Sequence, residues 1–95
     1  MTKNEAVEIK TYIDKEWYYL KDNLSYQNIV FNSNIVGEED KCFVAVQVHN
    51  GVCLCRRFFD ELYLNTIQPT GELVKKEIES MCDDVVMKTS NLQLK

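Results

Sequence analysis

Apolar side chains recur at three- and four-residue spacing over the first 24 residues, which is the pattern of one buried helix face. Charged residues such as Lys10 and Asp14 take the opposite side. Thr2 and Glu5 have the spacing of a capping box, in which each side chain binds a free backbone N–H at the helix start. The pattern predicts an amphipathic helix over about 3–24, whose buried stripe is Ala6, Ile9, Ile13, Trp17, Leu20 and Leu24.

Alternating apolar and polar positions replace the helical spacing in the middle of the chain and predict three strands. Residues 27–36 form the first, although the polar segment 32–34 is weak enough to hold a bulge. A glycine and three acidic residues at 37–40 predict a turn with concentrated negative charge. The runs 42–49 and 52–59 are rich in β-branched and aromatic residues and predict the second and third strands.

The dipeptide Asn50-Gly51 joins the last two strands and is the clearest local signal. Asn-Gly favours a two-residue type I′ turn, because both central positions need a positive φ. Such a turn pairs Val48 with Cys53. With the exception of Arg57, one face of this hairpin is then entirely apolar, which predicts that it faces the core: Cys42, Val44, Val46, Val48, Cys53, Cys55 and Phe59.

The reverse face of the hairpin is mixed, yet five of its eight side chains are apolar, and Phe43 stands opposite Phe58 in the predicted register. A sheet that is covered on one side shows a polar outer face. The apolar residues Phe43, Leu54 and Phe58 therefore predict a second cover. The C-terminal helix, a second subunit or a target protein could supply it, and the sequence leaves these alternatives open.

A second helix is predicted over about 71–87, with Thr70 as its N-cap. A short apolar segment at 60–68 precedes it and is expected to form a turn or a short helix. The tail 89–95 is expected either to fray or to form a short edge strand. The buried stripe of this helix is Val74, Ile78, Met81, Cys82 and Val85.

The resulting fold class is α+β, a three-stranded antiparallel sheet with an N-terminal and a C-terminal helix in the order α-β-β-β-α. Ninety-five residues allow one hydrophobic core, so we predict that 1–95 is a single small domain. The hydrophobic content of 45% and the charged content of 27% are ordinary values for a globular protein.

The formal net charge of −4 disfavours direct binding to nucleic acid or to an anionic membrane, since phosphates must be met by Lys and Arg. The same charge favours a basic partner. The first residues contain no apolar signal-peptide region, and no apolar run approaches the length of a membrane span. We therefore expect a cytoplasmic protein whose four cysteines are reduced thiols.

The cysteines lack the paired C-x₂₋₄-C spacing of structural zinc sites. In the predicted hairpin, Cys42 and Cys53 lie about 20 Å apart along the sheet, a gap that zinc–thiolate bonds cannot span. We expect no metal and no cofactor. The four residues, Cys42, Cys53, Cys55 and Cys82, are interpreted as small buried hydrophobic side chains.

No constellation of catalytic residues is visible. The single histidine, His49, is predicted on the sheet face opposite Cys53 and Cys55, so a Cys–His pair is geometrically poor. Nucleophile-elbow, zinc-protease, P-loop and dinucleotide-binding motifs are absent from the sequence, which contains three glycines. We predict that the protein is not an enzyme.

In its order of elements, the chain resembles a double-stranded-RNA-binding domain. The resemblance covers topology alone, and it implies that Lys75 and Lys76, near the start of the last helix, meet phosphates. Glu77 and Glu79 interrupt that basic patch. The acidic turn 37–40 also stands where the family reads the minor groove.

In size, acidic charge and layout, the chain is also similar to anti-CRISPR proteins, small phage and mobile-element antagonists of host defence. That resemblance implies inhibition of a host nucleic-acid-binding protein, with carboxylates presented to its basic groove. An alternative is a self-associating module that forms a homodimer through the reverse sheet face. The predicted partner-binding residues are Glu38, Glu39, Asp40, Phe43, Phe58, Asp83 and Asp84.

Overall fold

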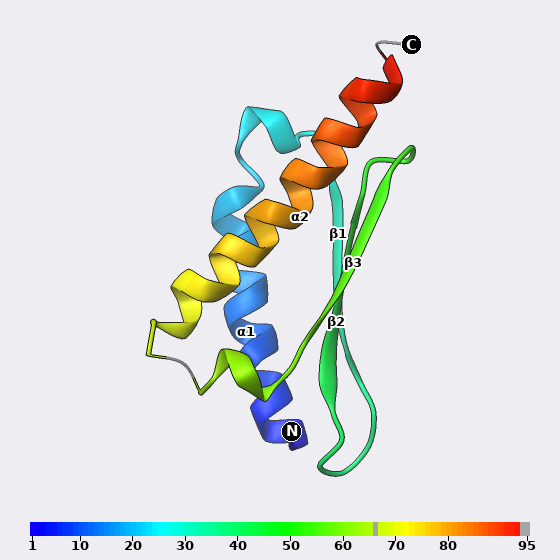
Figure 1. The fold of residues 1–95 in the computed structure, drawn as a ribbon. Coiled ribbons are helices and arrows are strands. Elements are labelled where there is room, and N and C mark those ends of the chain that lie inside the picture. The colour runs from blue at the N-terminus through cyan, green and yellow to red at the C-terminus, as the bar shows by residue number, and fades with distance from the viewer. Residues whose placement is uncertain (66, 94–95) are drawn as a thin grey trace.

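The computed structural model describes residues 1–65 and 67–93 and confirms the α+β class, with a helix, a three-stranded antiparallel sheet and a second helix (Figure 1). Two single 3₁₀ turns, η1 and η2, lie in the connections. The elements in chain order are α1 (Lys3–Leu20), η1 (Leu24–Tyr26), β1 (Val30–Val36), β2 (Phe43–His49), β3 (Leu54–Phe59), η2 (Glu61–Tyr63) and α2 (Thr70–Gln93).

The capping box at the start of α1 is confirmed. The backbone N–H of Glu5 donates to Thr2 Oγ1 at 3.2 Å, and the N–H of Thr2 donates to Glu5 Oε1 at 2.9 Å. The predicted end of the helix is wrong by four residues, because α1 stops at Leu20. The side chain of Asn23 caps η1 instead, and this local bond competes with helix continuation. Leu24 consequently leaves the buried stripe and is 80% exposed.

The strands form a sheet in the order β1-β2-β3, so β1 and β3 are its two edges. β1 pairs with β2 through seven consecutive residues, from Val30 opposite His49 to Val36 opposite Phe43. The segment 32–34 is therefore a regular part of the ladder and holds no bulge.

The predicted register of the β2–β3 hairpin is wrong by two residues. Val48 lies opposite Cys55, not Cys53, and Phe58 lies opposite Ala45, not Phe43. Side chains alternate between faces with a period of two, so a shift of two residues keeps every side chain on its predicted face.

The turn explains the shift. Its two central residues are Gly51 and Val52, because the N–H of Asn50 donates to the carbonyl of Cys53 at 3.2 Å. Asn50 Oδ1 also accepts the N–H groups of Val52 and Cys53. Among the hairpin's turn residues, Gly51 takes the positive φ, 86°, at the first central position, as in a type II′ turn. Asn50 is therefore a paired residue whose side chain supports the turn.

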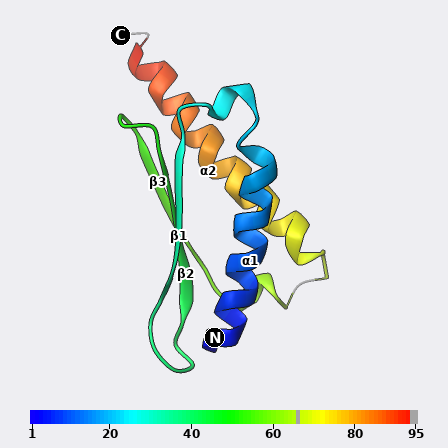
Figure 2. The same cartoon turned by 180° about the vertical axis from the view of Figure 1, so that it is seen from behind.

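Both helices pack against the same face of the sheet (Figures 1 and 2). This arrangement excludes α2 as the cover of the reverse face, one of the alternatives that the sequence left open. The predicted stripes of both helices meet the predicted core face of the hairpin. The fully buried residues are Ala6, Ile9, Ile13, Val44, Val46, Val48, Phe59, Val74, Ile78, Met81, Cys82 and Val85.

α2 continues to Gln93, so the prediction of a frayed or extended tail is wrong for residues 89–93. Thr89 Oγ1 accepts a hydrogen bond of 2.6 Å from Asn50 Nδ2 and donates to the carbonyl of Val85 at 2.9 Å. The last turns of the helix are thereby tied to the hairpin tip. The remainder of that predicted tail, 94–95, lies outside the described residues.

Candidate functional site

The candidate site is the sheet face that the helices leave uncovered, which we call the open face. Its most exposed apolar residues are Phe58 at 61%, Val30 at 54% and Leu54 at 50%. Large apolar side chains gathered on one surface commonly mark a binding site. The open face consists of Val30, Asn32, Asn34 and Val36 of β1, Phe43, Ala45, Gln47 and His49 of β2, and Leu54, Arg56 and Phe58 of β3.

Phe43 and Phe58 form an aromatic cluster on the open face. Their rings meet edge to face, with centroids 5.2 Å apart and an interplanar angle of 84°. They are diagonal neighbours, since Phe58 lies directly opposite Ala45. An edge-to-face pair of this kind contributes about 0.5–1.5 kcal/mol beyond its buried area. The pair is therefore a preformed apolar feature.

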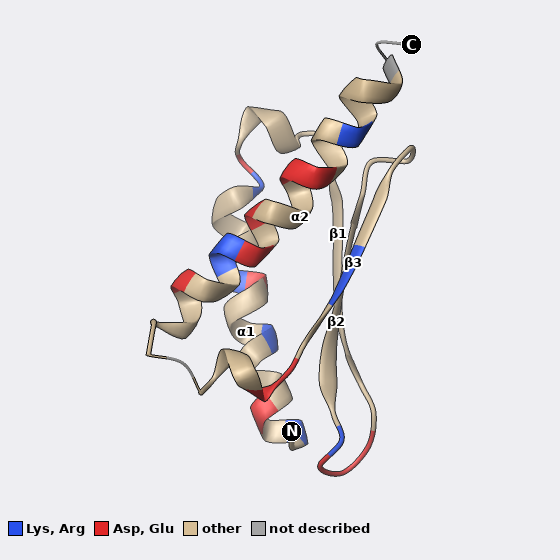
Figure 3. Cartoon of the chain, viewed as in Figure 1, with Lys and Arg blue, Asp and Glu red and all other residues tan. Residues whose placement is uncertain are grey.

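The acidic turn, Glu38, Glu39 and Asp40, lies at the same end of the sheet (Figure 3). Gly37 begins it with a φ of 100°, and a Cβ there would lie 2.2 Å from the carbonyl oxygen of Lys41. The structure thus brings five of the seven predicted partner-binding residues to one end of the molecule. A shallow cleft of about 350 Å³ lies beside them, lined by Met1, Lys41, Cys42, Phe43, Phe58 and Asp60.

The other two predicted residues, Asp83 and Asp84, lie on α2 in the helical layer. Asp83 Oδ1 accepts a hydrogen bond of 2.6 Å from the hydroxyl of Tyr26, which is buried. Burial and this hydrogen bond together raise the pKa of Tyr26. Asp84 is paired with Lys88 at 2.9 Å. Asp83 therefore has a structural partner 57 residues away in sequence, a contact that no sequence pattern revealed.

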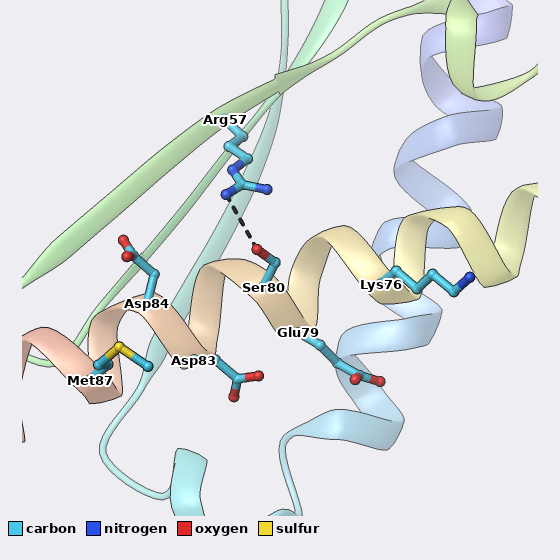
Figure 4. Close-up of a pocket in the computed structure, with 7 residues that line it drawn as sticks. All are labelled: Arg57, Lys76, Glu79, Ser80, Asp83, Asp84 and Met87. Atoms are coloured by element: carbon cyan, nitrogen blue, oxygen red, sulfur yellow. Dashed lines mark hydrogen bonds between the residues drawn. The ribbon is translucent and has the colours of Figure 1, made fainter.

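Arg57 links β3 to α2. Its Nη1 donates to Glu77 Oε2 at 2.5 Å. Its Nη2 donates to Ser80 Oγ at 3.4 Å, the bond that Figure 4 shows. Burial alone lowers the pKa of Arg57, but the bond and the charge of Glu77 outweigh it and the pKa is raised. A shallow cleft of about 470 Å³ follows this seam and carries charges of both signs, being lined by Arg57, Lys76, Glu79, Ser80, Asp83, Asp84 and Met87.

The lysines that the RNA-binding resemblance singled out lie in the first half of α2. Lys75 is 3.9 Å from the carboxylate of Glu79, one turn further along the helix. Glu77 and Glu79 follow both lysines within about one turn of the same helix. This surface is therefore mixed in charge rather than basic.

The cysteines lie on the helix-facing side of the sheet or in α2, and His49 lies on the open face. All four thiols are free. Burial raises the pKa of Cys82 to about 12, with a smaller contribution from the neighbouring Asp83. Among the residues that the structure describes, no group of three or more histidine, cysteine, aspartate or glutamate side chains is arranged to hold a metal ion.

Neither described helix combines the length and the apolar character that crossing a membrane requires. No protein-family model, curated protein or solved structure matches this chain.

Proposed function

We propose that this chain is a small acidic binding protein without enzymatic activity, which inhibits or modulates a protein partner by docking through the open face. The observation that carries the proposal is the exposure of Phe58, 61%, within an aromatic cluster on an apolar sheet face that no described element covers. Aromatic side chains are enriched in the centres of protein interfaces, where they account for much of the binding energy.

The charges around the aromatic cluster indicate the chemistry of the partner. The acidic turn at Glu38–Asp40 borders the cluster on one side, and Arg56 lies further along the open face. An apolar centre with a charged rim is the usual anatomy of an interface between proteins. A partner with basic residues beside an apolar patch would complement this surface and be attracted by the net charge of −4.

The similarity to anti-CRISPR proteins in size and charge makes a host nucleic-acid-binding protein the favoured partner. Such a protein presents a basic groove, which the acidic turn would enter while Phe43 and Phe58 contact an apolar wall. The proposal implies an encounter in the cytoplasm, where the four free thiols of the chain would stay reduced.

Affinity purification with a tagged chain tests the proposal. The decisive variant is Phe58→Lys, and Tyr19→Lys is its matched control, because Tyr19 is an aromatic residue with 63% exposure on α1. We expect mass spectrometry to find a protein retained by the wild type and by Tyr19→Lys, and lost with Phe58→Lys. Retention by Phe58→Lys at the wild-type level would refute docking through the open face.

Charge reversal tests the role of the acidic turn. Replacing Glu38 and Glu39 by lysine should slow association with the recovered partner, and the difference should shrink as salt is added. Replacing Asp22 and Glu72 by lysine changes the net charge equally at exposed positions of the helical side. Equal slowing in both double variants would show that net charge, and not the turn, steers the encounter.

A further inference from the structure

We infer that two copies of this chain pair along the free edge of β1, in antiparallel orientation, and form one continuous six-stranded sheet. This contact uses a surface other than the open face, so it goes beyond the function proposed above.

The edge of β1 is unprotected. No backbone hydrogen bond joins Val30–Val36 to any described residue outside β2, and Figure 2, which views the molecule from the β1 side, shows no ribbon in front of this strand. Natural edge strands are usually shortened, bulged, or guarded by charges or proline. β1 has seven residues, a regular ladder and neither a charge nor a proline. The opposite edge, β3, carries Arg56 and Arg57.

The sequence of β1 is self-complementary, which selects a second copy as the occupant. Val-Phe-Asn-Ser-Asn-Ile-Val has the same chemical order in both directions about its centre, Ser33. A two-fold axis beside Ser33 would place Val30 opposite Val36 of the second copy and Asn32 opposite Asn34 of the second copy. Phe31 would face Ile35, so side chains of the same class meet at every position, and a two-fold interface repeats each contact. Matched cross-strand pairs of this kind stabilise a sheet.

Two side chains of β1 on the helix-facing side, Phe31 and Ser33, are already held in place by α1. The ring of Trp17 stacks on Phe31 with centroids 5.0 Å apart, and Ser33 Oγ donates to Asp14 Oδ1 at 2.6 Å. Lys10 pairs with the other oxygen of Asp14 at 2.7 Å, which offsets the repulsion between the two Asp14 carboxylates near the axis. β1 would therefore associate with little loss of side-chain freedom.

The geometry of the pair keeps both helical layers on one side. The two-fold axis of an antiparallel strand pair is perpendicular to the sheet, so the two copies of α1 would become neighbours across the new seam. The two open faces would merge into one surface that displays two Phe43–Phe58 clusters. A dimeric partner could then be bound at two points, which raises avidity without any new contact.

Lysine substitutions at Asn32 and Asn34 test both the edge and the register. Both side chains are exposed on the open face, so neither change disturbs the core. Asn32→Lys with Asn34→Lys sets lysine opposite lysine twice across the axis, and we expect at least a tenfold weaker dimer. Asn32→Lys with Asn34→Glu sets lysine opposite glutamate twice, and this matched variant should stay dimeric.

Sedimentation equilibrium at submillimolar concentration gives the readout. The wild type should show twice the 11.1 kDa mass of one chain. The all-lysine variant should be a monomer with an unchanged circular dichroism spectrum. Mixing it with the variant Asn32→Glu with Asn34→Glu should restore a dimer, because lysine then faces glutamate at both positions. Recovery of the dimer would show that the separated chains are folded.

Three results would overturn the inference. The first is a wild-type monomer throughout the concentration range. The second is an all-lysine variant that dimerises as tightly as the wild type. The third is a dimer that Phe58→Lys dissociates and the all-lysine variant does not, which would move the contact to the open face. If Phe58→Lys loses the protein partner but still forms the dimer, the result concerns the proposed function and leaves the pairing along β1 intact.

Discussion

The two faces of the sheet differ most clearly at two neighbouring residues of β3, Phe58 and Phe59. Phe59 is fully buried beneath the helices, and its ring lies 4.6 Å from that of Tyr63. Phe58 points to the opposite side and is 61% exposed. A phenylalanine is therefore part of the core at position 59 and is exposed to solvent at position 58. The covered face holds the fold together, and the open face is free to be used for recognition.

The adjacent arginines repeat this division. Arg57 reaches α2, where it binds Glu77 and Ser80. Arg56 lies on the open face and donates from Nη2 to Gln47 Oε1 at 2.7 Å, a contact within the sheet. Arg57 therefore connects the sheet to the helical layer, whereas Arg56 contacts only a neighbouring strand. Substitutions on the two faces should therefore have separable effects on stability and on binding.

The largest expected difference is between Phe59→Ala and Phe58→Ala. Phe59→Ala should reduce the free energy of unfolding by about 3–5 kcal/mol, because it leaves a cavity in the core. Phe58→Ala should cost about 1 kcal/mol, the value of its contact with Phe43. Urea denaturation of both variants measures the difference. Similar losses of stability in the two variants would mean that Phe58 is also buried in solution and that the two faces do not differ.

The next effect concerns the helical layer. Tyr26→Phe should reduce the free energy of unfolding by about 2 kcal/mol, since it removes the hydroxyl that donates to the Asp83 carboxylate in a partly buried site. Asp84→Asn alters an exposed ion pair with Lys88 and is the matched control, for which we expect little change in the free energy of unfolding. An equal, small loss of stability in both variants would show that the hydrogen bond from Tyr26 to Asp83 has no structural role.

The burial of Tyr26 and its hydrogen bond to Asp83 predict that stability depends on pH in the alkaline range. The pKa of Tyr26 is raised in the folded state, while an unfolded tyrosine ionises near pH 10. Above that pH the unfolded state binds fewer protons than the folded state. The contribution of Tyr26 to stability is therefore fully present below about pH 10 and is lost as the pH rises further. In this range each pH unit lowers the free energy of unfolding by up to about 1.4 kcal/mol. Thermal denaturation from pH 9 to 11 should show a steeper decline for the wild type than for Tyr26→Phe.

The smallest effect is expected at the arginines. Arg57→Met should cost about 0.5–1 kcal/mol, because its ion pair with Glu77 is about one-third exposed and partly screened. Arg56→Met should change stability by less than about 0.5 kcal/mol. The order should reverse for binding, because the proposed partner would contact the open face, on which Arg56 lies. A larger effect of Arg57→Met on binding would place the partner at the seam between β3 and α2.

The sequence predicted the elements and the face of each hairpin residue, because hydrophobic periodicity reports burial directly. It did not predict the register. Asn50 has an intrinsic preference for a turn centre, and its bonds to Val52, Cys53 and Thr89 instead hold it in a paired position. The bond to Thr89 depends on α2 lying beside the hairpin tip, a tertiary contact that no sequence pattern indicates.

The sequence also could not decide what covers the reverse face. Both faces of the hairpin carry apolar residues, and the side on which α2 packs depends on the path of the chain after Phe59. For the candidate site, the aromatic pair and the acidic turn were found as features of sequence. Their meeting at one end of the sheet, and the engagement of Asp83 by Tyr26, came from the fold.

Amide chemical-shift mapping of the isotope-labelled chain, titrated with the partner that it retains, tests the central claim most directly. The open face should show the largest changes, at Phe43, Ala45 and Phe58, with the acidic turn following. Amides in the outer turns of α2 should stay within the noise. Changes concentrated around Asp83 and Asp84, with Phe58 unaffected, would contradict the account and assign recognition to the helical layer.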